Sequence, residues 1–243
     1  MKKLIYGMIP ARIGSQRLKL KNLALLNNKP LIYYAINSAK ASKVFDKICI
    51  NSDDDVFKKI ADRYKIDFYK RRKNLGSSNT KSDDVVYDFI KNFPSLDVLV
   101  WVNSIAPFQT GEDIKKIVDF FKREKKIDSL ITVENKKVHT NFNNKPLNYK
   151  KKSKFAKTQD LKGVQNFVYS LMMWKKKSFL KQYKKNKNAI LCGKTYFYPI
   201  TGLNTIMIKK FDDLNLANYV MKSKSKKFLV KYDKIIYAKK NKS

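Results

Sequence analysis

Short apolar runs alternate with amphipathic stretches along the first half of the chain. Runs of strand length occur at residues 4–9, 47–51, 66–69 and 96–102. Between them, apolar positions recur every three to four residues, which predicts three helices. They cover residues 30–41, a stretch that begins within residues 52–55 and ends at about 64, and residues 82–92. A helix over residues 112–124 and a strand over residues 129–133 continue the series. This alternation predicts an α/β fold with a mostly parallel sheet.

The pattern changes in the second half. From Glu134 to about Lys162, lysine, asparagine and aromatic residues dominate and neither period persists. Two interpretations stay open: a disordered basic linker, or a packed extension, which Phe142, Tyr149 and Phe155 favour. Regular patterns then predict a strand, a basic helix, a short apolar segment and an amphipathic helix over residues 166–174, 176–187, 196–200 and 211–221. We expect the lysine-rich end after Lys222 to be a solvated face or tail.

The composition indicates one folded domain. Of the 243 residues, 43% are apolar, which supplies the core of a single α/β domain over residues 1–243. No apolar run approaches the roughly 18 residues that cross a bilayer. The sequence Met1-Lys2-Lys3 runs directly into the first strand and lacks the pattern of a secretory leader. We therefore expect a cytoplasmic protein without a membrane segment.

Residue counts exclude several common kinds of site. The only histidine, His139, cannot form a His-rich zinc site. Cys49 and Cys192 are far apart, fit no metal spacing and are expected in the core. The glycines are too dispersed for either G-x-G-x-x-G or the Walker A pattern. A classical dinucleotide site and a P-loop are therefore excluded.

The net charge is +34 at neutral pH, which raises a nucleic-acid hypothesis. The cations are mostly lysines and occur in every segment, so they indicate a bias of the whole chain rather than one basic stripe. We do not expect nucleic acid as the partner, although a basic nucleic-acid-binding α/β protein stays open as an alternative. The same charge attracts nucleotides and acidic sugars.

The first strand leads into a loop that carries glycine and several cations. It contains Gly14 and Ser15, with cations at residues 12, 17, 19 and 21. In α/β proteins such loops hold phosphates, because backbone N–H groups converge on the anion and Arg or Lys neutralises its charge. The local pattern leaves two interpretations open: a phosphate loop, or an ordinary connection with solvated lysines.

Polar residues also follow the second strand and begin the third helix. The cluster Ser52-Asp53-Asp54-Asp55 suits either a metal or the start of a helix. The helix start is favoured, because Ser and Asp cap helices and acidic groups stabilise their N-termini. Ser82 is likewise expected to cap the next helix.

The loop after the first strand resembles the opening signature of the CMP-sialic acid synthetases, or acylneuraminate cytidylyltransferases. The matching residues are Pro10, Ala11, Arg12, Gly14, Ser15, Lys21 and Asn22, all in register. The related CMP-Kdo synthetases share only the first half of this signature. The resemblance implies the nucleotide-diphospho-sugar transferase fold, a Rossmann-like three-layer α/β/α arrangement, and a loop that wraps the triphosphate of CTP. It is tight over residues 4–120 and only topological afterwards.

The resemblance also implies a reaction and roles for particular residues. The anomeric hydroxyl of an acidic, sialic-type sugar would attack the α-phosphate of CTP, giving a CMP-sugar for surface-glycan synthesis and pyrophosphate. Arg12 and Lys21 would be the catalytic cations. The full predicted nucleotide site comprises Ala11, Arg12, Gly14, Ser15, Gln16, Lys21, Asn22, Arg71, Ser82 and Asn103. In the family, the portion corresponding to residues 134–170 protrudes, forms a homodimer and completes the neighbour's acceptor site.

The second half departs from the family pattern. The family binds Mg²⁺ through two aspartates, but Met207 and Lys209 stand at those positions here, and Asp212 and Asp213 are the remaining candidates. Thr158 and Asn166 stand where arginines meet the sugar carboxylate. Two interpretations therefore survive: an active cytidylyltransferase with an altered acceptor site, or a nucleotide-binding relative with lost or altered catalysis. Sialic, legionaminic, pseudaminic and Kdo-type acids all share the carboxylate, so the sequence does not choose among them.

Overall fold

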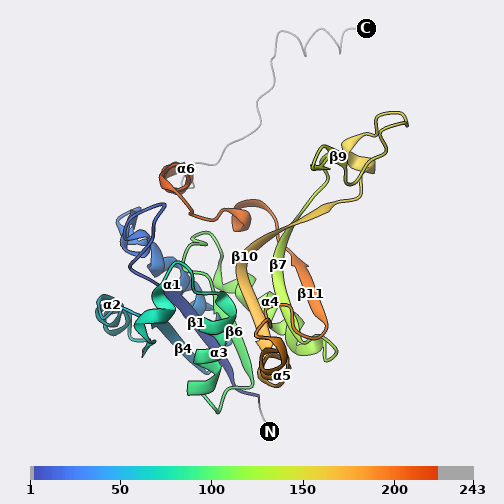
Figure 1. The fold of residues 1–243 in the computed structure, drawn as a ribbon. Helices are drawn as coiled ribbons and strands as arrows, with labels where there is room; N and C mark the ends of the chain where they lie inside the picture. The colour runs from blue at the N-terminus through green and yellow to red at the C-terminus, as the bar shows by residue number, and fades with distance from the viewer. Residues whose placement is uncertain (1–2, 224–243) are drawn as a thin grey trace.

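The fold is built on one seven-stranded sheet. The computed structural model describes residues 3–223, so most of the lysine-rich end lies outside the described residues. The strand order is β11-β7-β10-β6-β1-β4-β5 (Figure 1). In chain order, the strands of this sheet are β1 Ile5–Ala11, β4 Lys47–Ser52, β5 Asp67–Lys70, β6 Val98–Val102, β7 Ser129–Lys136, β10 Val164–Lys175 and β11 Thr195–Pro199.

Most neighbouring strands run parallel. The pairs β1–β4, β1–β6, β4–β5 and β7–β11 are parallel, whereas β10 is antiparallel to both of its neighbours, β6 and β7. The predicted α/β fold with a mostly parallel sheet is confirmed. Because the parallel strands β1, β5 and β6 end at one edge of the sheet, the loops that follow them meet there.

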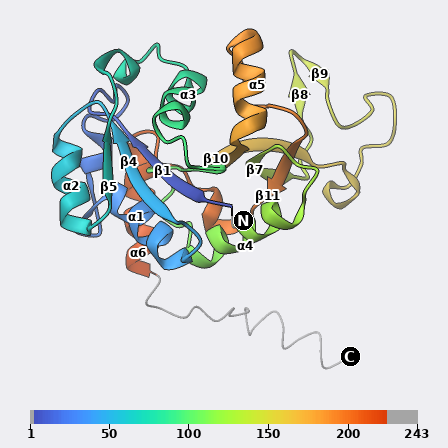
Figure 2. The same cartoon turned by 90° about the horizontal axis from the view of Figure 1, so that it is seen from below.

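Helices cover both faces of the sheet (Figures 1 and 2). On one face, α1 Leu31–Ser42, α2 Val56–Tyr64 and α4 Gly111–Arg123 enclose a core that includes Ile36, Phe57 and Ile117. On the other face, α3 Ser82–Asn92 and α5 Lys176–Asn186 pack through Phe89 and Phe179. The apolar stripes expected from the helical spacing are the faces that pack in these two cores.

Both cysteines lie in the core, as expected. Cys49 and Cys192 are fully buried, and burial raises their pKa values to about 12 and about 11. Because the reactive form of cysteine is the thiolate, both thiols are unreactive at neutral pH. They serve as small core residues.

A third, smaller core joins the loop after β1 to the end of the described chain. Here α6 Phe211–Ser223 packs on the short hairpin of β2 Leu25–Leu26 and β3 Lys29–Pro30. One-turn helices η1 Lys21–Leu23, η2 Lys73–Gly76, η3 Thr158–Asp160 and η4 Gly202–Thr205 complete the short elements. The third core thus brings the segment before α6 next to the first loop.

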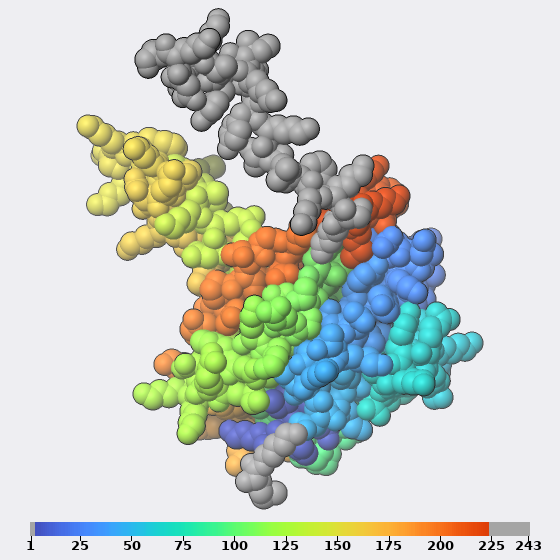
Figure 3. All heavy atoms as spheres, turned by 180° about the vertical axis from the view of Figure 1, so that it is seen from behind, coloured from blue at the N-terminus to red at the C-terminus, as the bar shows by residue number. Residues whose placement is uncertain are grey.

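The middle of the chain forms a two-stranded projection. Strands β7 and β10 continue past the rest of the sheet and end in the hairpin of β8 Asn141–Phe142 and β9 Lys145–Pro146. Figure 1 shows this part reaching away from the sheet, and Figure 3 shows the same part, in yellow, standing clear of the body. Phe142, Leu147 and Phe155 expose more than half of their side chains there. We call residues 134–167 the projecting hairpin.

One of the two expectations about helix starts needs correction, whereas the acidic cluster does begin α2, as expected. Helix α3 is preceded by Lys81 as N-cap and no side chain caps it, so the prediction that Ser82 caps this helix is wrong. Ser82 is instead its first residue. At α2 the N-cap is Asp55, whose side chain makes no capping bond, while Asp54 Oδ1 accepts from the N–H of Val56 at 2.9 Å.

None of the helices between residues 3 and 223 combines the length and the apolar character that a membrane crossing requires.

Candidate functional site

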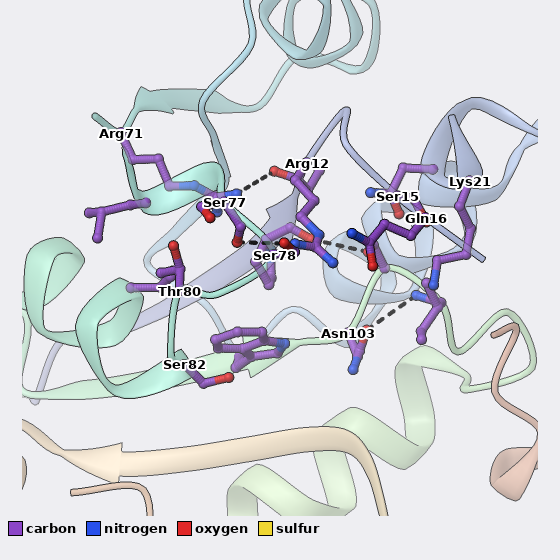
Figure 4. Close-up of a pocket in the computed structure, with 18 of the residues that line it drawn as sticks. Arg12, Ser15, Gln16, Lys21, Arg71, Ser77, Ser78, Thr80, Ser82 and Asn103 are labelled. Atoms are coloured by element: carbon purple, nitrogen blue, oxygen red, sulfur yellow. Dashed lines mark hydrogen bonds between the residues drawn. The ribbon is translucent and has the colours of Figure 1, made fainter. Parts of the chain in front are cut away.

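A pocket of about 450 Å³ lies where β1, β5 and β6 end. Nine of the ten predicted nucleotide-binding residues line it: Ala11, Arg12, Ser15, Gln16, Lys21, Asn22, Arg71, Ser82 and Asn103. The exception is Gly14, which lies outside the lining. Figure 4 shows that the site is elongated, with Arg71 and Lys21 at opposite sides and Arg12 between them.

One side of the pocket is strongly cationic. Arg12, Arg17 and Lys21 all line it and come from the single loop after β1. Burial lowers the pKa of Lys21, and the positive charges of Arg17 and Arg12 lower it further. An anion placed among these three groups would relieve their mutual repulsion, which is the physical basis of phosphate binding.

Arg71 forms the opposite side and is almost completely buried, with 4% of its side chain exposed. Its Nη1 donates to the carbonyl of Asn51 at 3.0 Å, and its Nη2 donates to the carbonyl of Ala11 at 3.0 Å and to Asp53 Oδ1 at 3.1 Å. These bonds fix the guanidinium from β4 and β1. Asp53 is thus the partner of a pocket residue as well as part of the turn before α2.

Buried polar atoms without a partner gather at this pocket. Within residues 3–223 there are four such side-chain atoms: Asn22 Oδ1, Arg71 Nε, Trp101 Nε1 and His139 Nε2. The first three belong to residues that line the pocket. A buried group of this kind costs about 1–3 kcal/mol, so a fold that keeps three of them in one cavity is suited to a ligand that pairs with them.

The remaining predicted residue, Asn103, is held by the backbone. Its Oδ1 accepts from the N–H of Ile105 at 3.4 Å (Figure 4). Its Nδ2 donates to the carbonyl of Tyr169 at 3.1 Å. Tyr169 has a left-handed backbone, with φ 60°, inside the irregular part of β10. Asn103 therefore joins the pocket edge to the base of the projecting hairpin.

Several lining residues were not singled out from the sequence as site residues. Arg17 lies in the same loop as the predicted cations, and Ser77, Ser78 and Thr80 form the polar turn after Arg71. Arg12 Nη1 donates to the carbonyl of Ser77 at 3.1 Å, so this turn and the first loop close on each other. Another omission is Trp101, an aromatic residue in an otherwise aliphatic strand.

The described residues do not offer a fitting set of Mg²⁺ ligands. No carboxylate lines the pocket, and within residues 3–223 no three acidic, His or Cys side chains are grouped so that they could hold a metal ion. Asp213 Oδ2 accepts from the backbone N–H groups of Lys209 at 2.7 Å and Lys210 at 2.9 Å, which uses it to start α6. Asp212 pairs with Lys210 at 2.8 Å on the exposed surface.

Lys209 lies near the cationic side of the pocket, where acidic side chains would be needed to bind Mg²⁺. The N–H of Ile208 donates to the carbonyl of Ile105, a lining residue, at 2.9 Å. This bond brings the segment before α6 to the pocket rim. The Lys209 charge contributes to lowering the pKa of Lys21, whereas Asp213 raises it. Mg²⁺ prefers several hard oxygen ligands, which this segment does not supply.

The positions at which the family pattern has arginines for the sugar carboxylate lie elsewhere. Thr158 in η3 and Asn166 in β10 are both on the projecting hairpin, and neither lines the pocket. The described pocket therefore combines cations with unpaired buried polar atoms, but does not include the positions of Thr158 and Asn166.

Comparison with known proteins identifies the family to which this architecture belongs. The family model for cytidylyltransferases matches residues 6–199. The chain belongs to the cytidylyltransferase family. This confirms, at the level of the family, the resemblance that the first loop indicates.

Curated relatives match the first part of the chain. The N-acylneuraminate cytidylyltransferase of Escherichia coli is 27% identical over 133 residues, covering 55% of this chain and 32% of that protein. The post-translational flagellin modification protein B of Campylobacter coli is 33% identical over 130 residues, covering 51% of this chain and 55% of that protein. A 3-deoxy-manno-octulosonate cytidylyltransferase of Bdellovibrio bacteriovorus is 28% identical, with coverage of 51% and 48%. The match spans about a third to about half of the length of these relatives.

Solved structures share the fold over most of the chain. A CMP-2-keto-3-deoxy-manno-octonic acid synthetase complexed with CTP superposes with a TM-score of 0.69 at 13% identity, covering 91% of this chain and 99% of that one. A 4-diphosphocytidyl-2C-methyl-D-erythritol synthase from Anaerococcus prevotii superposes with a TM-score of 0.65 at 15% identity, covering 90% and 99%. At these identities the likeness establishes the fold alone.

Proposed function

We propose that the chain is a cytidylyltransferase that moves CMP from CTP to an acidic, sialic-type sugar and releases pyrophosphate. The observation that carries this proposal is the pocket itself. It joins three cations on one side to three unpaired buried polar atoms, and nine predicted nucleotide-binding residues line it. Family membership and the relatives named above support the same activity.

The cationic side suits the triphosphate. Arg12, Arg17 and Lys21 would neutralise the phosphate oxygens, while Ser15 and the loop N–H groups fix their geometry. When the anomeric hydroxyl attacks the α-phosphorus, a new P–O bond forms and the bond to the β-phosphate oxygen breaks. The leaving pyrophosphate carries negative charge, and cations held beside it stabilise that charge.

The opposite side suits the nucleoside. Arg71 offers a donor there and is fixed too firmly to turn away. Asn22, which follows Lys21 in η1, adds an acceptor to the same pocket. Ser82 adds a hydroxyl from the first turn of α3. A ligand that pairs with these groups removes their desolvation penalty, so binding and orientation are achieved together.

Protein-held Mg²⁺ is not used in this proposal, because the described carboxylates near the rim are engaged by backbone N–H groups and lysine. An ion that arrives on the phosphates of CTP needs no such ligands. We accordingly expect CTP to stabilise the protein even when a chelator removes divalent cations. An Mg²⁺ requirement for the chemical step remains a prediction of family membership.

The acceptor and the assembly complete the proposal. We propose a cytoplasmic homodimer in which the projecting hairpin of each chain completes the acceptor site of the other. This agrees with the position of Thr158 and Asn166 on the hairpin, outside the pocket lining. The product would supply surface-glycan synthesis.

The first experiment is thermal melting with CTP, UTP, ATP and GTP, each with Mg²⁺ and with a chelator. A shift that is largest for CTP supports the nucleotide site, and pyrophosphate release in a screen of sugar acids then supports the transferase. A CTP shift without pyrophosphate release for any sialic, legionaminic, pseudaminic or Kdo-type acid points to a relative that binds nucleotide without this chemistry. Equal shifts for all four nucleotides contradict the cytidine proposal.

A further inference from the structure

The indole of Trp101 presents a hydrogen-bond donor that the fold leaves unused. Its Nε1 is buried and has no partner, and Trp101 lines the pocket. The other tryptophan, Trp174, provides an internal comparison, because its Nε1 donates to the carbonyl of Ile190 at 2.8 Å. The fold thus satisfies the indole in the core but not the indole at the pocket.

The position of Trp101 assigns it to one side of the site. It lies in β6, opposite Met8 of β1 and Met172 of β10, near the carboxyl ends of the parallel strands. Its ring packs against the core that includes Val85 of α3. Val85 and Ser82, one turn apart on α3, line the same pocket. In Figure 4, Ser82 and Arg71 are both on the side of the pocket away from Lys21.

The chemistry of the indole limits which ligand groups it can bind. Its N–H is a donor only, so it needs an acceptor atom, and its flat ring favours a flat, weakly polar neighbour. Phosphates have their own cations on the other side of the pocket. A heteroaromatic base carries carbonyl or ring-nitrogen acceptors at its edge, and such an acceptor satisfies the N–H, which lies in the plane of the indole.

We propose that Trp101 is a base-binding residue, whose indole N–H donates to an acceptor of the cytosine ring. The proposal rests on the proposed function, because it takes the pocket to hold CTP. Together with Arg71 Nε, Trp101 gives the nucleoside side two unused donors. Cytosine has two adjacent acceptors, O2 and N3, whereas uracil carries a hydrogen at N3. Two donors therefore favour cytosine, since a donor that faces another donor loses its bond.

The decisive variant is Trp101→Phe, which keeps one aromatic ring in the core and removes the N–H together with the second ring of the indole. We expect its affinity for CTP to fall about three- to tenfold, the range of one neutral hydrogen bond. Its affinity for inorganic triphosphate, which reaches only the cationic side, should not change. Lys21→Met should lower the affinity for both ligands. If Trp101→Phe binds CTP like the wild type, or loses triphosphate and CTP binding equally, the proposal is wrong.

A second measurement needs no stable variant at Trp101. The chain has only two tryptophans, and Trp174 is fully buried with its N–H bonded. CTP should therefore change the tryptophan emission of the wild type through Trp101, and inorganic triphosphate should not. The matched control, Trp174→Phe, should keep the change. Emission that stays constant while CTP raises the melting temperature would overturn the role of Trp101 but leave the proposed function standing. Failure of CTP to bind the wild type would instead contradict the proposed function.

Discussion

Arg71 is fixed by acceptors on two neighbouring strands, and this determines what a substitution does. The carbonyls of Asn51 and Ala11 and the carboxylate of Asp53 all receive N–H groups from one planar guanidinium. A lysine at the same place has one compact ammonium and cannot reach all three acceptors in that geometry. The substitution would keep the positive charge but lose the set of three hydrogen bonds.

We therefore expect Arg71→Lys to lower CTP affinity at least about tenfold and to cost about 2 kcal/mol of stability, because buried acceptors lose their donors. Calorimetric titration with CTP and chemical denaturation measure the two effects. Arg72→Lys is the matched control, since Arg72 is 73% exposed and only approaches Asp88 at 3.5 Å. It should change stability by no more than about 0.5 kcal/mol. Equal effects of the two substitutions would contradict the assigned role of Arg71.

Lys21 gives the site a pH dependence with a definite sign. Burial and the charges of Arg17 and Arg12 lower its pKa from the ordinary 10.5. In the empty protein the charge on Lys21 lowers the free energy of unfolding at neutral pH. This destabilisation is lost as pH rises through the window between the lowered pKa and 10.5, because Lys21 gives up its proton in the folded state first. A bound triphosphate favours the charged form, so it raises the pKa again.

It follows that CTP affinity should fall as pH rises through the same window, earlier than the titration of ordinary surface lysines. Titrations from neutral pH to about 10 measure this fall. Lys21→Arg keeps its charge throughout and should remove the early part of the fall. An unchanged pH profile in Lys21→Arg would show that another group is responsible.

At the scale of elements, helices α1 and α4 approach each other through Gly111. A Cβ placed there would lie 2.7 Å from Ala41 Cβ and 2.8 Å from the backbone N of Ser42. Gly111 also starts α4, directly after the capping Thr110, whose hydroxyl accepts from the N–H of Asp113 at 3.1 Å. Close packing of these two helices holds the end of the loop that leads from the pocket into α4.

Gly111→Ala should therefore force the two helices apart and cost about 1–3 kcal/mol, the usual range for overpacking. Chemical denaturation measures the loss. Gly14→Ala is the matched control, because a Cβ at Gly14 meets no atom within 4 Å. It should leave stability within about 0.5 kcal/mol of the wild type. If both glycines tolerate alanine equally, the helices have room that the structure does not show.

Hydrophobic periodicity predicts most of the regular elements but not the two short hairpins, which are indicated only by their turn residues. Buried strands such as β6 are continuous apolar runs, and the helices have one apolar face, so both can be recognised without tertiary information. The turns of the two hairpins, in contrast, are Asn27-Asn28 and Asn143-Asn144, with φ between 45° and 61°. Each pair precedes Lys-Pro-Leu, and this repeated Asn-Asn signal for a tight turn was present in the sequence.

The site was predictable to the extent that one segment carries it. The first loop holds its cations within one short segment, at residues 12, 17, 19 and 21, so a single motif identifies them. The bonds of Arg71 to Ala11 and Asn51 and the unpaired N–H of Trp101 depend on how strands far apart in sequence pair. Such properties arise only in the folded protein, so no local pattern reports them.

At the scale of the whole molecule, the projecting hairpin exposes several large apolar side chains. Phe142 is 68% exposed, Leu147 58% and Phe155 77%. Phe155 also stacks on His139 with ring centroids 3.9 Å apart, so the exposed ring is held in place. Several exposed apolar side chains on one projecting segment are consistent with an interface. The same hairpin carries Thr158 and Asn166, which are outside the pocket lining of their own chain.

These features lead to the prediction that the protein is a dimer in light scattering and that Phe142→Ser with Phe155→Ser makes it a monomer. The nucleotide pocket is complete within one chain, so the monomer should keep its stabilisation by CTP. Sugar-dependent pyrophosphate release should fall by more than about tenfold, because the acceptor site loses the residues of the partner. Tyr219→Ser is the matched control, since this ring is 72% exposed on α6, away from the hairpin. A monomeric wild type would contradict the assembly, and a monomeric variant with full transferase activity would show that the acceptor site is formed by one chain.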